Sequence, residues 1–242
     1  MLFSLRRGAL TGAAVVLLLG PALAEETTLA AGAGYRRPIA EVAAAYEQQS
    51  GDKVLQIYGH MGQVLAQARE SAQIAIVCGD RTVLERAQGV AFERMVSLGF
   101  GKLVVAYRKG LTLTKAEEIA GPEFKRIGIP DQASAIYGKA GRQFLERSAL
   151  AATIDPRLIA VATVPQVTSY VASGEVDAGF VNATDAIGAA ANIGGFVAVD
   201  KGLYDPVEIV CAVRAPTTKA AEGFVGFLGS APAREILNRY GL

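Results

Sequence analysis

Short apolar runs alternate with helical stretches along most of the chain, and this alternation is the main guide to its fold. Runs such as Thr28–Ala31 and Ile74–Cys78 have the length and composition of buried strands. The stretch Pro38–Gln49 has helical periodicity, with Pro38 in its first turn and Gly51 just after its end. Strands that alternate with helices predict parallel sheets covered on both faces.

Two such series follow one another and are separated near Leu103–Arg108. The strand Glu208–Val213 and the two last helices are surplus to the second series, so we expect the chain to return and complete the first lobe. The sequence therefore predicts two α/β lobes, each a mainly parallel sheet flanked by helices, joined by two hinge crossings. The predicted bounds are 25–106 with 208–242 for the first lobe and 107–207 for the second. Sheets of this type bind ligands beyond the carboxyl ends of their strands, so a ligand cleft is expected between the lobes.

The first 24 residues have the features of a secretory signal peptide. Arg6 and Arg7 precede an uncharged run, and Ala22-Leu23-Ala24 fits a cleavage site after Ala24. Removing this segment takes away two of the 24 basic residues and none of the 23 acidic ones, which leaves a net charge of −1. A near-neutral chain without a basic run argues against nucleic acid as a partner. We expect a mature monomer in the periplasm.

Two further features of the sequence are its pair of cysteines and its lack of common catalytic motifs. Cys78 and Cys211 both lie in apolar, strand-like runs, where they are either buried as small hydrophobic residues or joined as a disulfide between neighbouring strands. The chain has one histidine and none of the common hydrolase, metalloprotease or phosphate-loop motifs. We therefore expect a binding protein without a cofactor, not an enzyme.

Three stretches carry a resemblance to a known family: Ile39–Glu47, Val171–Val181 and the segment from Phe224 to Leu242. In them the sequence resembles the molybdate-binding periplasmic proteins of ABC importers, and the resemblance extends from about Thr28 to Leu242. It implies a two-lobed periplasmic-binding-protein fold whose hinge closes on a small ligand. It also implies an ABC permease in the inner membrane as the partner.

The resemblance further implies where the ligand binds. Proteins of that family hold a tetrahedral oxyanion with hydroxyl groups and with backbone N–H groups at helix N-termini. In this chain Gly34 and Gly62 stand where the family has serines, and Asn182 stands where it has a tyrosine, so side-chain hydroxyls are lost while backbone donors remain. The implied ligand-binding residues are Gly34, Tyr35, His60, Met61, Gly62, Tyr137, Gly138, Val164 and Asn182.

Larger side chains in the same loops leave other ligands open. His60 and Met61 are side chains that copper(I) prefers, with Cys78 as a further candidate, although a single histidine is more often a surface or hydrogen-bonded residue. Tyr35 and Tyr137 suit ferric iron or a flat organic ligand, or they pack against the hinge. Beside these loops, Arg36 and Arg37 either attract an anion or form a salt bridge.

The prediction from sequence is a periplasmic solute-binding component of an ABC importer, which binds a small oxyanion such as molybdate or tungstate between its lobes. The alternative is a transition metal ion or metal complex held by tyrosine, histidine and methionine side chains, in an importer component or a periplasmic sensor. Asp177, in one of the resembling stretches, is expected to be a solvated charge.

Overall fold

The computed structural model describes residues 24–242, so the predicted signal peptide lies outside the described residues except for Ala24. Within that range, no helix has the length and apolar character needed to cross a bilayer.

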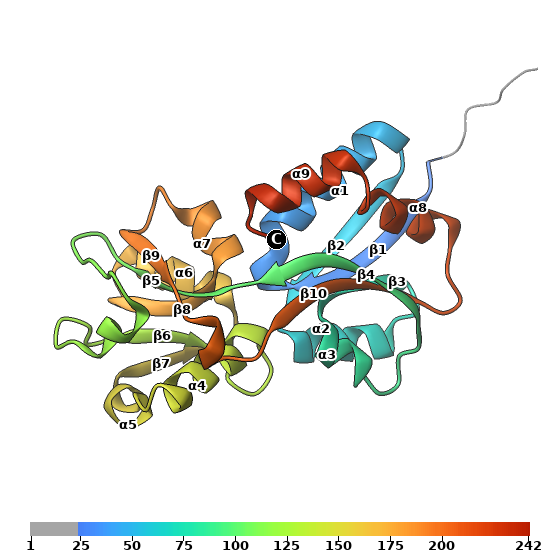
Figure 1. Cartoon of the computed structure of the whole chain (residues 1–242). Coiled ribbons are helices and arrows are strands. Elements are labelled where there is room, and N and C mark those ends of the chain that lie inside the picture. The colour runs from blue at the N-terminus through green and yellow to red at the C-terminus, as the bar shows by residue number, and fades with distance from the viewer. Residues whose placement is uncertain (1–23) are drawn as a thin grey trace, which may run out of the picture.

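Two five-stranded sheets form the centres of two lobes (Figure 1). The first sheet has the strand order β2 (Lys53–Gly59), β1 (Glu26–Gly32), β3 (Ile74–Asp80), β10 (Val207–Arg214) and β4 (Phe92–Gly101). The second has the order β7 (Leu158–Val161), β6 (Ile127–Pro130), β8 (Ala178–Asn182), β5 (Leu103–Tyr107) and β9 (Gly195–Ala198).

Helices flank both sheets. The first lobe carries α1 (Arg36–Ser50), α2 (Met61–Glu70), α3 (Arg81–Glu85), α8 (Lys219–Phe227) and α9 (Ala231–Arg239). The second carries α4 (Ile136–Arg147), α5 (Ala151–Ile154), α6 (Val164–Ser173) and α7 (Ala183–Ala189). The described 3-10 turns are η1 (Ala33–Tyr35), η2 (Ala116–Ala120), η3 (Asp155–Arg157) and η4 (Lys201–Leu203).

The antiparallel strand of each sheet is the one that arrives from the other lobe. β10 runs antiparallel to β3 and β4, and β5 runs antiparallel to β8 and β9. The pairs that β1 makes with β2 and β3, and that β6 makes with β7 and β8, are parallel. The two chain crossings lie side by side at the centre of Figure 1, with Val207 opposite Gly101. The predicted fold of two mainly parallel lobes with two crossings is confirmed.

The position of the first crossing differs from the prediction. We expected residues 25–106 in the first lobe, but Leu103–Tyr107 pairs with β8 and β9 of the second sheet. The chain therefore crosses between Gly101 and Leu103. The apolar pattern of this run reveals a buried strand, yet periodicity does not say which sheet the strand joins.

The two cysteines form a disulfide. Cys78 on β3 is the register partner of Cys211 on β10, and the Cys78–Cys211 bond links strands that are 133 residues apart in sequence. Both side chains are buried in the first lobe. Of the two alternatives left open by the sequence, the structure selects the disulfide between neighbouring strands.

Asp177 is buried, contrary to the expectation of a solvated charge, and it ties three strand ends together. Its carboxylate accepts hydrogen bonds from Arg108 Nε at 2.9 Å and from the N–H groups of Lys125 and Arg126 at 2.9 and 3.0 Å. Burial alone raises the pKa of Asp177, but these donors outweigh burial and hold the pKa below its usual range. The helix end at Gly174 explains the error, because Asp177 lies just beyond it and reads as part of an exposed turn.

Asp177→Asn is expected to lower the free energy of unfolding at pH 7 by about 2–3 kcal/mol, because two backbone donors and one guanidinium lose a charged acceptor. The pKa of Asp177 is lower in the folded state, so its stabilisation is complete above about pH 4, the unfolded value, and is lost as pH falls through the folded pKa. Urea unfolding at pH 7 and pH 3 measures both effects. The exposed neighbour Glu175→Gln is the control, and an equal deficit at both pH values would contradict the assignment.

Candidate functional site

Four segments from both lobes meet at one small cavity between the sheets. The first lobe supplies the loop after β1 and the start of α2, and the second supplies the starts of α4 and α6. The cavity has a volume of about 20 Å³. Its lining residues are Gly32, Ala33, Gly34, Tyr35, Gly59, His60, Met61, Ala135, Ile136, Tyr137, Thr163 and Val164. Six of the nine predicted ligand-binding residues are among them.

Helix starts from both lobes lie at this cavity. The first-turn N–H groups of Met61, Gly62 and Val164 have no acceptor within residues 24–242. Such groups carry the positive end of the helix dipole, which favours an anion. The lining contains no aspartate, glutamate, lysine or arginine. The cavity can therefore hold a negative charge through backbone dipoles without a competing carboxylate.

His60 caps a helix, and Met61 packs against β3. The Nδ1 atom of His60 accepts a hydrogen bond from the N–H of Gln63 at 3.3 Å. The side chain of Met61 is buried, and its Sδ would lie 2.5 Å from a Cβ placed on Gly79. Among the described residues, no three His, Cys, Asp or Glu side chains gather as a metal site. The disulfide also removes the Cys78 thiol that the metal hypothesis had considered.

Tyr35 and Tyr137 meet across the lobes and rest against the hinge. Their hydroxyl oxygens are 2.5 Å apart and share a hydrogen bond. Burial, followed by the neighbouring Tyr137 hydroxyl, raises the pKa of Tyr35 well above its ordinary value, and burial also raises the pKa of Tyr137, so both stay protonated at neutral pH. A Cβ on Gly101 would lie 1.9 Å from Tyr137 Oη and 2.5 Å from Tyr35 Oη. The pair thus both lines the cavity and contacts the first crossing.

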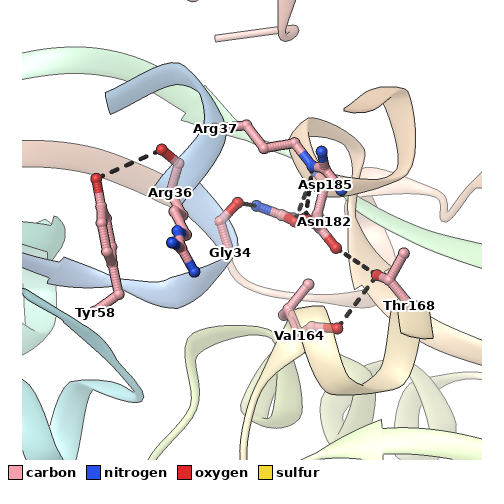
Figure 2. Close-up of polar contacts among 8 residues, drawn as sticks. All are labelled: Gly34, Arg36, Arg37, Tyr58, Val164, Thr168, Asn182 and Asp185. Carbon is pink, nitrogen blue, oxygen red and sulfur yellow. Dashed lines mark hydrogen bonds and ion pairs between the residues drawn. The ribbon is translucent and has the colours of Figure 1, made fainter. Parts of the chain in front are cut away.

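Asn182 lies outside the cavity lining and joins the lobes instead (Figure 2). Its Nδ2 donates to the carbonyl oxygen of Gly34 at 2.9 Å, and its Oδ1 accepts from the N–H of Asp185 at the start of α7. A Cβ on Gly34 would lie 3.0–3.3 Å from the Asn182 amide group. The two departures from the resembling family therefore fit each other, because the missing side chain at position 34 leaves room for the amide.

A second link between the lobes lies beside the first. Arg37 Nε is 3.4 Å from Asp185 Oδ1, and the other carboxylate oxygen of Asp185 accepts from Thr168 Oγ1 at 2.5 Å (Figure 2). The stem of Arg37 crosses α7 at Gly188, where a Cβ would approach Arg37 Cδ to 2.1 Å. Arg36 lies over the ring of Tyr58, with 5.7 Å from Cζ to the ring centroid. Of the two alternatives for this arginine pair, Arg37 forms the salt bridge.

The other two predicted residues, Gly62 and Gly138, lie just outside the lining. A Cβ on Gly62 would lie 3.1 Å from His60 and 3.2 Å from Ser134 of the other lobe. A Cβ on Gly138 would lie 2.1 Å from the carbonyl oxygen of Asp131, so α4 can pack here only with glycine. Sequence reasoning missed six lining residues, all of which flank predicted ones in the same loops: Gly32, Ala33, Gly59, Ala135, Ile136 and Thr163.

Comparisons with known proteins agree with this architecture. The family profile described as bacterial extracellular solute-binding protein matches residues 27–242. The chain is 26% identical to the molybdate-binding protein ModA of Rhodobacter capsulatus over 98% of this chain and 96% of that protein. It is also 26% identical to the ModA protein of Azotobacter vinelandii over 93% and 92% of the two chains.

The solved structure of the periplasmic molybdate-binding protein of Azotobacter vinelandii has the same fold. It superposes with a TM-score of 0.81 and 26% identity, and the match covers 89% of this chain and 97% of that one. The profile match spans nearly the whole described range, and the two lobes agree with it. The chain belongs to the bacterial extracellular solute-binding protein family.

Proposed function

We propose that the protein captures a small tetrahedral oxyanion of the molybdate class between its lobes and delivers it to an ABC permease in the inner membrane. The observation that carries this proposal is the convergence of helix starts from both lobes on one cavity that has no charged lining residue. The relatives named as molybdate-binding proteins support the same ligand class. In this proposal the mature protein is a periplasmic monomer that binds without chemical change.

Ligand entry requires movement of the lobes. The cavity of about 20 Å³ has room for a single water, which needs at least about 10–15 Å³. An anion with four oxygens is larger than this cavity. The lobes must therefore rotate apart about the two crossings to admit the anion, and they close around it afterwards. Separation breaks the Tyr35–Tyr137 and Asn182–Gly34 hydrogen bonds. These contacts therefore belong to the closed form and influence the affinity.

A thermal-shift screen of the metal-free mature protein tests the proposal. Molybdate or tungstate is expected to raise the melting temperature by roughly 5–10 °C at a concentration about 100 times Kd, because ligand binds only the folded state. A shift with transition metals alone, abolished by His60→Ala, would contradict the oxyanion proposal and favour the metal alternative. Failure of every oxyanion to shift the melting temperature would also contradict it.

Gly62→Ala is expected to weaken oxyanion binding about tenfold, because overpacking costs about 1–3 kcal/mol and is relieved when the lobes open. The added methyl group would sit between His60 and Ser134, which belong to different lobes. Gly226→Ala is the matched control, since a Cβ on this glycine of α8 would meet nothing within 4 Å. Titration calorimetry of both variants gives the comparison, and equal affinities would show that the lobes do not close at this contact.

A further inference from the structure

A second and much larger space between the lobes adjoins the small cavity. This side groove is bounded by α2 and α3 of the first lobe, by α4 of the second, and by the second crossing at residues 205–207. Its volume is about 610 Å³, within the range of about 300–1,000 Å³ typical of sites for small organic molecules. Ile136 lines both spaces, so its side chain lies between the groove and the cavity.

Three cationic side chains line the side groove: Arg69, Arg86 and Lys139. Within residues 24–242 none of them lies within salt-bridge distance of a carboxylate. Two come from the first lobe and one from the second. Arg69 lies beside Gly89, where a Cβ would be 3.1 Å from Arg69 Cδ.

The two carboxylates that line the side groove already have donors. Asp80 accepts from the hydroxyl of Thr82 and from the N–H of Val83 at 3.1 Å. Asp205 accepts from Gln143 Nε2 at 2.7 Å and from Arg147 Nη2 at 2.5 Å. The lining therefore carries three cations against two carboxylates, a net charge of +1, which favours an anionic ligand.

We propose that the side groove holds the anionic tail of an organic ligand whose oxyanion head occupies the small cavity. The ligand class is a small organic molecule with a tetrahedral anionic head and a carboxylate or phosphate on its tail. The inference rests on the proposed function, because the head uses the same helix starts. Arg69 and Arg86 approach the tail from one lobe and Lys139 from the other, so the tail stabilises the closed form.

Two phosphonates with the same three-carbon chain test this inference by calorimetry. 3-Phosphonopropionate carries a carboxylate tail, and propylphosphonate carries a methyl group in its place. The first is expected to bind the wild-type protein about tenfold more tightly than the second, and the difference should shrink as NaCl rises from low salt to about 0.5 M. Equal affinities of the two phosphonates would overturn the inference.

Matched variants locate the effect. Arg86→Gln/Lys139→Gln should remove most of the advantage of the carboxylate tail and leave inorganic molybdate or phosphate binding unchanged. Lys115→Gln, a cation outside the groove, should change neither. An advantage that survives in the double variant would also overturn the inference.

The same titrations separate the two proposals. Tight binding of inorganic oxyanions, with no preference between the phosphonates, overturns the side groove and leaves the proposed function standing. Binding of 3-phosphonopropionate without any inorganic oxyanion supports the groove and overturns the molybdate class. An absence of binding by every probe overturns both.

Discussion

Replacing Cys78 and Cys211 with alanine is expected to lower the free energy of unfolding by about 3–5 kcal/mol. The disulfide closes a loop of 133 residues that contains the entire second lobe. It joins β3, the last strand before α3, to β10, the strand that returns through the second crossing. Such a link restricts the unfolded chain and holds the central pair of the first sheet.

Urea unfolding of the wild-type protein with and without dithiothreitol measures this effect. Reduced wild-type protein keeps both sulfur atoms, so its difference from the oxidised form reports the bond, and its difference from the alanine variant reports lost packing. The alanine variant should be insensitive to dithiothreitol. Equal unfolding midpoints for oxidised and fully reduced wild-type protein would show that the bond does not contribute to stability.

The order of elements could be predicted because strong local signals mark them. Gly51 and Gly174 end helices in the left-handed conformation, with φ values of 82° and 79°, and Gly51 was predicted as a helix end from the sequence. β4 was missed because it is an edge strand with Glu93 and Arg94 near its start, so it lacks a buried face along much of its length. The crossing at Gly101 was misplaced because pairing is decided by tertiary contacts.

The location of the candidate site was predictable, while its internal geometry was not. In each lobe the carboxyl ends of the parallel strands face the space between the lobes, which brings the loop of Gly34 and Tyr35 from the first lobe to Tyr137 of the second. The partners of Asn182 depend on the relative placement of two lobes, and its amide could not be assigned to the Gly34 carbonyl from sequence. The side groove likewise depends on how α2, α3 and α4 are spaced across the interface.

Gly101→Ala is expected to destabilise the protein by about 2–4 kcal/mol, because the new methyl group displaces two buried hydroxyls that hydrogen-bond to each other. The added Cβ would lie 1.9 Å from Tyr137 Oη and 2.5 Å from Tyr35 Oη. Both rings are buried, so neither can swing into solvent. Urea unfolding, with Gly226→Ala as the glycine-to-alanine control, measures the loss.

A double-mutant cycle identifies the hydroxyls as the cause. Tyr35→Phe/Tyr137→Phe removes both hydrogen-bonding partners while keeping the rings, which is expected to cost less than about 1.5 kcal/mol. In that background the closest remaining atom to the new Cβ is Cζ of residue 137 at 3.3 Å, a contact that a small shift can relieve. Gly101→Ala should then cost about 1 kcal/mol or less, giving a coupling of roughly 1–3 kcal/mol.

An undiminished cost of Gly101→Ala in the phenylalanine background would mean that the hinge backbone itself, and not the tyrosine pair, requires glycine at position 101. With the coupling present, the crossing at Gly101 and the small cavity share one contact, which couples the hinge backbone to two side chains that line the cavity.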